Sequence, residues 1–251
     1  MTVLEAVAIA LAGVAAGTIN TVVGSGTLVT FPVLLALGYS PVVANVSNTV
    51  GLVPGSLSGS LGYRRELAGQ RARVLRLSGA SLLGGTAGAV LLLVLPASAF
   101  RAIVPLFIGV GVVLVILQPR ITRALERRGI ARAEHAGPGT YLAVFGAGVY
   151  GGYFGAAQGV LLLAILGLSL AETLQRMNAI KNVLAGLVNL VAGVVFVIAA
   201  HVAWGAALLI AAGSVIGGQV GAGVGRRMSP TLLRAAIVVV GVVAIVRLLT
   251  Q

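Results

Sequence analysis

Long apolar runs, separated by short polar or basic breaks, occupy almost the whole of this 251-residue chain. A helix needs roughly 20 apolar residues to cross the ~30 Å hydrocarbon core of a bilayer, and most of the runs are about that long. The pattern therefore predicts an all-α polytopic membrane protein with about ten transmembrane segments, five in each half. We expect them at 3–23, 26–38, 41–63, 74–95 and 100–118, and then at 140–156, 159–170, 177–200, 202–223 and 232–250.

The two halves of the chain repeat one another. When the chain is shifted along itself by 133 residues, Gly24-Ser25-Gly26 falls on Ala157-Gln158-Gly159, and the glycine-rich run 84–88 falls on 217–221. Duplicated halves are common among secondary transporters, whose binding site lies between the halves near mid-membrane. We therefore divide the chain into a first transmembrane repeat at 1–118, an arginine-rich cytoplasmic loop at 119–139 and a second transmembrane repeat at 140–251.

The second segment of each half, at 26–38 and 159–170, has only about 12 residues. A helix of that length is ~18 Å long, which is too short to cross the hydrocarbon core. Each of the two follows a break that contains glycine, at 24–26 and at 155–159. Short, glycine-interrupted segments at matching places in two halves are the best sequence indication of a transport site. Whether they span the membrane or re-enter it stays open at this point.

Most of the net charge of +12 comes from arginines in short loops, where the positive-inside rule places them, and it does not indicate nucleic-acid binding. The loop 64–76 and the central loop hold five arginines each, so we expect both to face the cytoplasm. In the second half the pattern reverses. The stretch that matches 64–76 holds only His201, whereas the stretch that matches the uncharged turn 96–98 holds Arg226 and Arg227. This reversal predicts an inverted repeat with both termini outside.

The residue types that most often catalyse reactions, bind metals or conduct cations are absent, few or outside the predicted membrane segments. The chain has no Asp and no Cys, only two His, and five Glu that all fall at predicted segment ends or in loops. Cation and proton pumps usually carry carboxylates in mid-membrane, and metal sites need clustered Cys, His or carboxylates. We therefore expect no enzyme activity, no cofactor and no carboxylate-based cation path.

Polar residues inside the apolar runs gather at the breaks and in the third segment of each half. Asn45, Asn48 and Thr49 share one helix face, and Asn178, Lys181 and Asn182 repeat the same spacing. The alternative is that these groups only join neighbouring helices by hydrogen bonds, and that Lys181, the sole lysine, reaches outward to the headgroups. The candidate substrate-binding residues are Asn20, Thr21, Gly24, Ser25, Gly26, Thr27, Asn45, Asn48, Thr49, Gln158, Gly159, Asn178, Lys181 and Asn182.

The breaks themselves favour an anion. A helix that starts after Gly26 or Gly159 points free backbone N–H groups and a positive dipole end into the protein. Two such helix starts that meet at mid-membrane, beside amide and hydroxyl donors, suit a small anion that binds between the two repeats.

At these residues the chain resembles the sulfite exporter TauE/SafE family. The resemblance rests on Gly17-x-x-Asn20-Thr21-Val22-Val23-Gly24-Ser25-Gly26, Phe31-Pro32-x-Leu34, Ala44-Asn45-x-x-Asn48-Thr49 and Gly59-x-x-Gly62-Tyr63, with a weaker copy from Gly146 through Gly159 to Asn178-x-x-x-Asn182. It implies export of sulfite, organosulfonates or related anions across the cytoplasmic membrane. Ser25 and Gln158 interrupt a run that usually has more glycine in the family, which leaves the substrate open.

Two other classes of function stay open on the sequence alone. One is a transporter of a cation or a neutral solute, against which the missing mid-membrane carboxylates argue. The other is a non-transporting membrane assembly subunit, against which the duplicated breaks argue. The expected partners are a small anionic substrate and the lipid bilayer, with no nucleic acid, and a homo-oligomer is also left open.

Overall fold

The computed structural model of the protein describes residues 1–127, 137–223 and 230–249. These residues form ten helices and no strand, which confirms the all-α prediction. The helices are α1 (Val3–Val22), α2 (Thr27–Ala36), α3 (Pro41–Gly62), α4 (Arg71–Val94), α5 (Ala97–Arg127), α6 (Pro138–Tyr153), α7 (Gln158–Ser169), α8 (Leu174–Ala199), α9 (Trp204–Gly223) and α10 (Pro230–Leu249).

The largest departure from the expected helix bounds is at α5. The apolar pattern ends this segment at residue 118, but the helix continues through Arg127 into the predicted central loop. Residues 120–127 are rich in Arg, Leu, Ala and Glu, which favour helix without being apolar. A hydrophobic pattern cannot detect such an extension. The rest of that loop at 128–136, together with Arg226 and Arg227, lies outside the described residues.

Five of the described helices are long and apolar enough to cross a membrane, so the chain is a multi-pass membrane protein. These are α1, α4, α5, α8 and α9. As expected, α2 and α7 are apolar but shorter, with 10 and 12 residues. Helix α3 has sufficient length but interrupts its apolar residues with a polar stretch from Asn45 to Thr49. The total of ten crossings stays a prediction.

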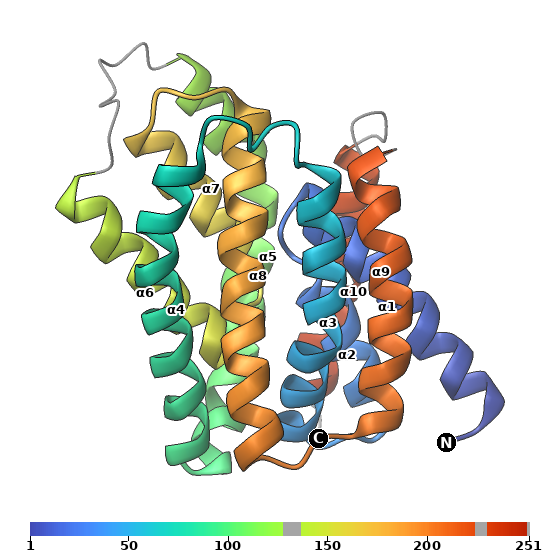
Figure 1. Cartoon of the computed structure of the whole chain (residues 1–251). Coiled ribbons are helices and arrows are strands. Elements are labelled where there is room, and N and C mark those ends of the chain that lie inside the picture. The colour runs from blue at the N-terminus through green and yellow to red at the C-terminus, as the bar shows by residue number, and fades with distance from the viewer. Residues whose placement is uncertain (128–136, 224–229, 250–251) are drawn as a thin grey trace.

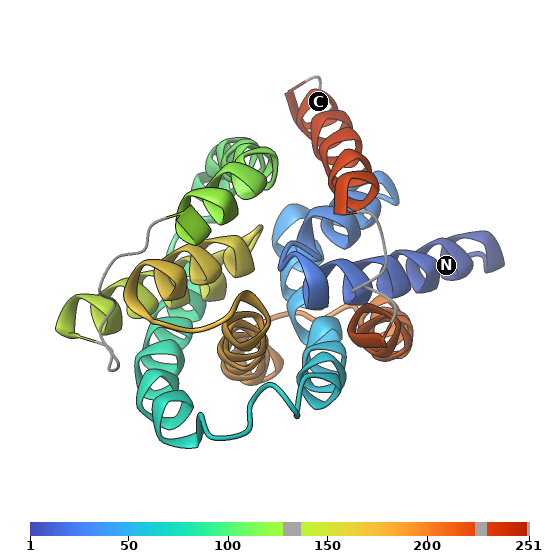
Figure 2. The same cartoon turned by 90° about the horizontal axis from the view of Figure 1, so that it is seen from above.

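The helices form two groups that lie side by side (Figures 1 and 2). One group contains α4, α5, α6, α7 and α8, and the other contains α1, α2, α3, α9 and α10. Each group therefore mixes helices from both halves of the chain. Helix α1 packs along α9 and α4 packs along α6. Because the 133-residue shift places α1 on α6 and α4 on α9, these two pairings correspond to each other.

Glycine permits the closest of these helix contacts. A Cβ on Gly88 of α4 would lie 2.1 Å from the carbonyl oxygen of Val149 in α6, and a Cβ on Gly217 of α9 would lie 2.1 Å from that of Val14 in α1. No side chain fits at such distances, so the two backbones touch directly, as small residues allow in membrane helices. The runs 84–88 and 217–221 thus have a packing role.

Helices α3 and α8 pack against each other where the two groups meet. Asn189 of α8 donates a hydrogen bond from Nδ2 to Oγ of Ser56 in α3 at 3.2 Å, and these two residues are 133 positions apart. Matching residues of two related halves can touch only close to the axis that relates them. At the α3–α8 contact, positions of the two halves that match under the 133-residue shift therefore meet.

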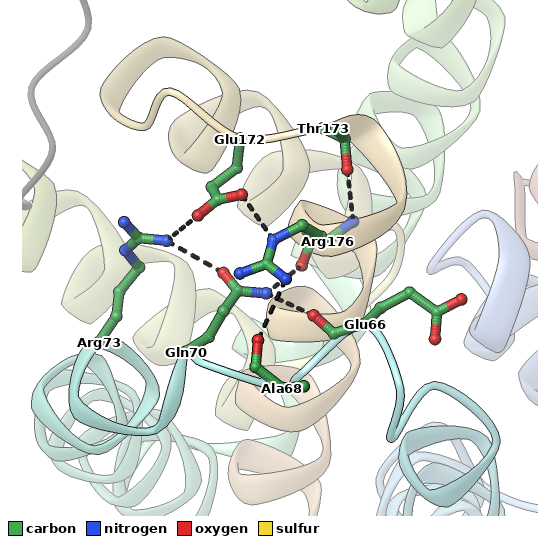
Figure 3. A network of polar contacts seen from close by, with 7 residues as sticks. All are labelled: Glu66, Ala68, Gln70, Arg73, Glu172, Thr173 and Arg176. Atoms are coloured by element: carbon green, nitrogen blue, oxygen red, sulfur yellow. Dashed lines mark hydrogen bonds and ion pairs between the residues drawn. The ribbon is translucent and has the colours of Figure 1, made fainter.

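A polar network joins the α3–α4 connection to the α7–α8 connection (Figure 3). The Glu172 carboxylate binds Arg73 at 2.6 Å and Arg176 at 2.7 Å, and Arg176 also donates to the carbonyl of Ala68. Partial burial acts to raise the pKa of the Glu172 carboxyl, but hydrogen bonds and charge from both arginines outweigh it, and the pKa lies below its usual value. The network ties the arginine-bearing loop 64–76 to Arg176 at one end of the molecule, the top in Figure 1.

Candidate functional site

The two glycine-containing breaks meet inside the protein. The structure places the first break at 23–26, between α1 and α2, and the second at 154–157, between α6 and α7. The backbone N–H of Gly159, in the first turn of α7, donates to the carbonyl of Gly24 at 3.0 Å. A Cβ on either glycine would lie 2.4 Å from the Cα of the other. The breaks can approach this closely only because neither residue carries a side chain.

The backbone turns the same way at matching positions of the two breaks. Gly24 has φ of 87° and Ala157 has φ of 58°, and these residues coincide under the 133-residue shift. Glycine adopts such left-handed angles without strain, whereas alanine does so at a cost of roughly 1–2 kcal/mol. Strained backbone of this kind gathers at functional sites, where the surrounding structure holds it in place.

Five buried backbone N–H groups at the breaks have no hydrogen-bond acceptor among the described residues. In the first break and the start of α2 they belong to Ser25, Gly26 and Thr27, and in the second break to Ala156 and Ala157. The first N–H groups of a helix have no partner within the helix, and in a buried place they need one from elsewhere. The two breaks, together with the first residue of α2, therefore hold unused donors.

Side chains near the breaks also have unused polar atoms. Among the residues that the structure describes, Oγ of Ser25 and Nε2 of Gln158 have no hydrogen-bond partner, and their residues are 1% and 4% exposed. The Tyr153 hydroxyl and the Oδ1 atoms of Asn45 and Asn178 are likewise buried without a partner. A buried polar group without a hydrogen bond costs about 1–3 kcal/mol, so such a concentration makes this place the candidate binding site.

In the first half, a small polar cluster joins α3 to the start of α2. Asn48 donates from Nδ2 to Oγ1 of Thr27 at 3.3 Å and accepts a hydrogen bond from Oγ1 of Thr30. All three side chains are buried. Thr30 is absent from the candidates predicted from the sequence, although it follows Thr27 by three positions and so lies on the same helix face.

In the second half, the matching face of α8 binds a different helix end. Lys181, which matches Asn48, donates from Nζ to the carbonyls of Asn20 and Thr21 at 3.1 and 3.3 Å. Nδ2 of Asn178 and of Asn182 also donate to Thr21, at 3.2 and 3.3 Å. Three donors from α8 therefore converge on the last turn of α1. Lys181 is fully buried, so it does not reach out to the headgroups.

The end of α6 is held in a related way by α3. Asn45, the counterpart of Asn178, donates from Nδ2 to the carbonyl of Tyr153 at 2.9 Å. Tyr153 falls on Asn20 under the 133-residue shift, and this correspondence is the signal that would have added Tyr153 to the predicted site. The third segment of each half thus binds the end of the first helix of the other half.

Three of the predicted residues take no direct part in these contacts with their side chains. The hydroxyl of Thr21 donates to Gly17 and that of Thr49 donates to Asn45, each within its own helix. The side chain of Asn20 is only half buried. These residues contribute through their backbone or by packing.

An aromatic cluster, not predicted from the sequence, covers the second break. Phe154 contacts Phe31 of α2 edge to face, with ring centroids 5.0 Å apart, and also contacts Phe100 and Phe107 of α5. The Tyr150 hydroxyl donates to the carbonyl of Ala156 at 2.5 Å. These contacts hold the second break against α2 and α5. No group of three or more His, Cys, Asp or Glu lies together in the described part of the chain.

Comparison with known proteins places this architecture among membrane transporters. The sequence model of a protein family described as "Sulfite exporter TauE/SafE" matches residues 9–248. The chain is 26% identical over 242 residues to the "Probable membrane transporter protein YfcA" of Escherichia coli (strain K12), a match that covers 93% of this chain and 86% of that protein. It is 25% identical over 228 residues to a "Probable membrane transporter protein" of Haemophilus influenzae, with 90% and 88% covered. No solved structure matches the chain.

The close approach of the breaks predicts unequal costs for two similar substitutions. Gly24 and Gly38 both have φ of 87°, but a Cβ on Gly38 meets nothing within 4 Å. Gly38→Ala should therefore cost only the backbone strain, about 1 kcal/mol. Gly24→Ala adds the overlap with Gly159 and should cost a further ~1–3 kcal/mol. Thermal unfolding of the detergent-purified variants measures the difference. Equal losses of stability would show that the breaks do not touch.

Proposed function

The chain belongs to the sulfite exporter TauE/SafE family, and we propose that it is a secondary transporter of a small anion in the cytoplasmic membrane. The substrate class that we infer comprises sulfite, organosulfonates and related sulfur-containing or carboxylate anions. The observation that carries this proposal is the set of five buried N–H groups without acceptors where the two breaks meet. Unused donors at helix starts bind negatively charged groups.

The side chains at the breaks extend this donor set. The Ser25 hydroxyl and the Gln158 amide are buried with atoms that have no partner, and both can donate to an oxyanion. The start of α2 also holds Thr27, whose hydroxyl accepts from Asn48 and keeps its own hydrogen free to donate. We propose that Ser25, Thr27, Asn48 and Gln158 contact the anion, with the backbone of Gly24, Gly26 and Gly159 close to it.

The remaining predicted residues act one step away from the anion. Asn45, Asn178 and Asn182 hold the ends of α1 and α6, and so fix the two breaks in position. Asn20, Thr21 and Thr49 contribute backbone and helix contacts to the same framework. Lys181 adds a positive charge in the same region, which also favours an anion nearby.

Two buried acceptors without donors bear on the protonation state of the substrate. Oδ1 of Asn45 and Oδ1 of Asn178 are buried without donors. An anion that still carries a hydrogen, such as hydrogen sulfite, would satisfy acceptors as well as donors. A bare cation would satisfy only the acceptors and would leave the five N–H groups unpaired, which disfavours the alternative of a cation transporter.

We propose that transport proceeds by alternating access between two inverted repeats. The exchange of helices between the two groups, and the α3–α8 contact where matching residues meet, support a pair of related halves around one site. Movement of one group against the other would open the site first to one face and then to the other. The Glu172 network would then close the face that carries the loop 64–76.

Flux measurements in proteoliposomes test the proposed substrate class. Labelled sulfite, an alkyl sulfonate and acetate would be offered at several pH values, with and without sodium. We expect saturable flux of at least one anion and a KM raised about 5- to 150-fold in Ser25→Ala, because the loss of one hydrogen bond to a charged ligand is worth ~1–3 kcal/mol.

Ser78→Ala provides the matched control, because the Ser78 hydroxyl donates to Val74 within α4 at 2.7 Å. That variant should transport with an unchanged KM. Absence of flux for every anion in the panel would contradict the proposed function. An unchanged KM in Ser25→Ala would place the anion elsewhere in the protein.

Matching loops of the two halves test the inverted topology. Ala68 and His201 are exposed, lie 133 residues apart, and belong to a chain that has no Cys. We expect a membrane-impermeant maleimide to label His201→Cys in intact cells and to label Ala68→Cys only after the membrane is permeabilised. Labelling of both positions from the same side would rule out the inverted repeat.

A further inference from the structure

Lys181 has unusual surroundings for a buried amine. Its side chain is fully buried in α8, and Nζ lies 3.1 Å from the carbonyl oxygen of Asn20 and 3.3 Å from that of Thr21. No carboxylate forms an ion pair with it among the described residues. The compensating negative charge comes from the last turn of α1, where the carbonyl groups carry the negative end of the helix dipole.

The Thr21 carbonyl also accepts a hydrogen bond from another side chain of α8. Asn178 donates from Nδ2 to the Thr21 carbonyl, and its Oδ1 is buried without any partner. Without the lysine side chain, the Asn20 carbonyl would lose this donor, and both α1 carbonyls would border the volume that Nζ leaves empty. Backbone carbonyls at the C-terminal end of a broken helix are groups that coordinate small monovalent cations in membrane transporters.

The first half shows what this place looks like without a cation. In the first half, the neutral Asn48 occupies the position that matches Lys181, and it forms hydrogen bonds with Thr27 and Thr30. The corresponding end of α6 receives a single hydrogen bond, from Asn45 to Tyr153. The two halves therefore share a framework, but only the second half brings a positive group to a helix end.

We propose that the carbonyl end of α1 is a monovalent cation site and that the Lys181 ammonium group is its built-in occupant. The tethered ammonium supplies the charge that sodium, potassium or ammonium would otherwise supply, so the folded protein needs no bound cation at this position. The inference concerns a site beside the proposed anion site, and it holds whichever solute the protein transports.

Removal of the tethered charge tests the proposal through stability. Lys181→Ala would be purified and melted in choline, sodium, potassium, ammonium and methylammonium chloride at equal ionic strength. We expect a lower melting temperature in choline and a recovery in at least one of the smaller cations. That recovery should grow with the logarithm of the cation concentration, because a ligand that binds only the folded state stabilises it in this way. The wild type should melt at the same temperature in all five salts.

Two further variants complete the test. Asn48→Ala removes the matching side chain of the first half and should show no dependence on the cation. Lys181→Gln keeps a hydrogen-bond donor but removes the charge, and it covers the case in which Lys181→Ala does not fold. We expect this variant to be destabilised in choline and restored by a small cation.

Two results would overturn the proposal. One is wild-type stability of Lys181→Gln in every salt, because a neutral donor would then be sufficient at the end of α1. The other is a melting temperature of the Lys181 variants that is equally low in all five salts. Neither result depends on flux, so a failure here and a failure of the proposed anion transport can be told apart.

Discussion

The central constraint in this protein is that a helix broken inside a membrane must find partners for its freed backbone groups. No water is available there to satisfy them, and each unpaired group is costly. The chain meets this constraint by bringing its two breaks together, so that the N–H of Gly159 bonds to the carbonyl of Gly24. Glycine at both positions makes the contact possible. The orientation of α1, α2, α6 and α7 depends on this one meeting point.

The C-terminal and N-terminal helix ends at this point differ in their hydrogen bonds. The ends of α1 and α6 receive donors from the protein itself. Groups from α8 bind the carbonyls of Asn20 and Thr21, and Asn45 of α3 binds the carbonyl of Tyr153. The two breaks and the first residue of α2 keep N–H groups without acceptors among the described residues. The protein's own side chains therefore bind carbonyls at these two helix ends, whereas we propose that an anion binds the N–H groups without acceptors. This asymmetry is the physical basis of the proposed anion site. It also lets a lysine lie close to that site without an ion pair to any carboxylate of the described residues.

Much of this arrangement could be predicted from the sequence, because it depends on local pattern. The apolar runs locate the ten helices, and the glycines locate both breaks. The helical spacing of Asn178, Lys181 and Asn182 predicts that they share a face, and the structure shows that all three bind the end of α1. The direction in which Lys181 points is not a local property. It depends on α1, which is more than 150 residues away in sequence.

Other features depend wholly on tertiary contacts or on residues that are not apolar. Each group of helices combines helices from both halves, and glycine contacts such as that of Gly88 with Val149 hold this combination together. The hydrophobic period of a single segment cannot predict which other helix it contacts. The extension of α5 to Arg127 comes from helix-favouring residues outside the apolar run. The partners of the second break, Phe31 and Phe154, look like ordinary apolar residues until the fold brings them together.

The most direct test of the account is to locate an anion in the protein. Selenite has the charge and shape of sulfite, and its selenium can be identified by anomalous scattering in crystals of the purified wild-type protein. We predict one strong selenium peak where the two breaks meet, within hydrogen-bonding distance of Oγ of Ser25 and Nε2 of Gln158. Selenium peaks only beside the loop arginines, such as Arg65, with none at the breaks, would contradict the account.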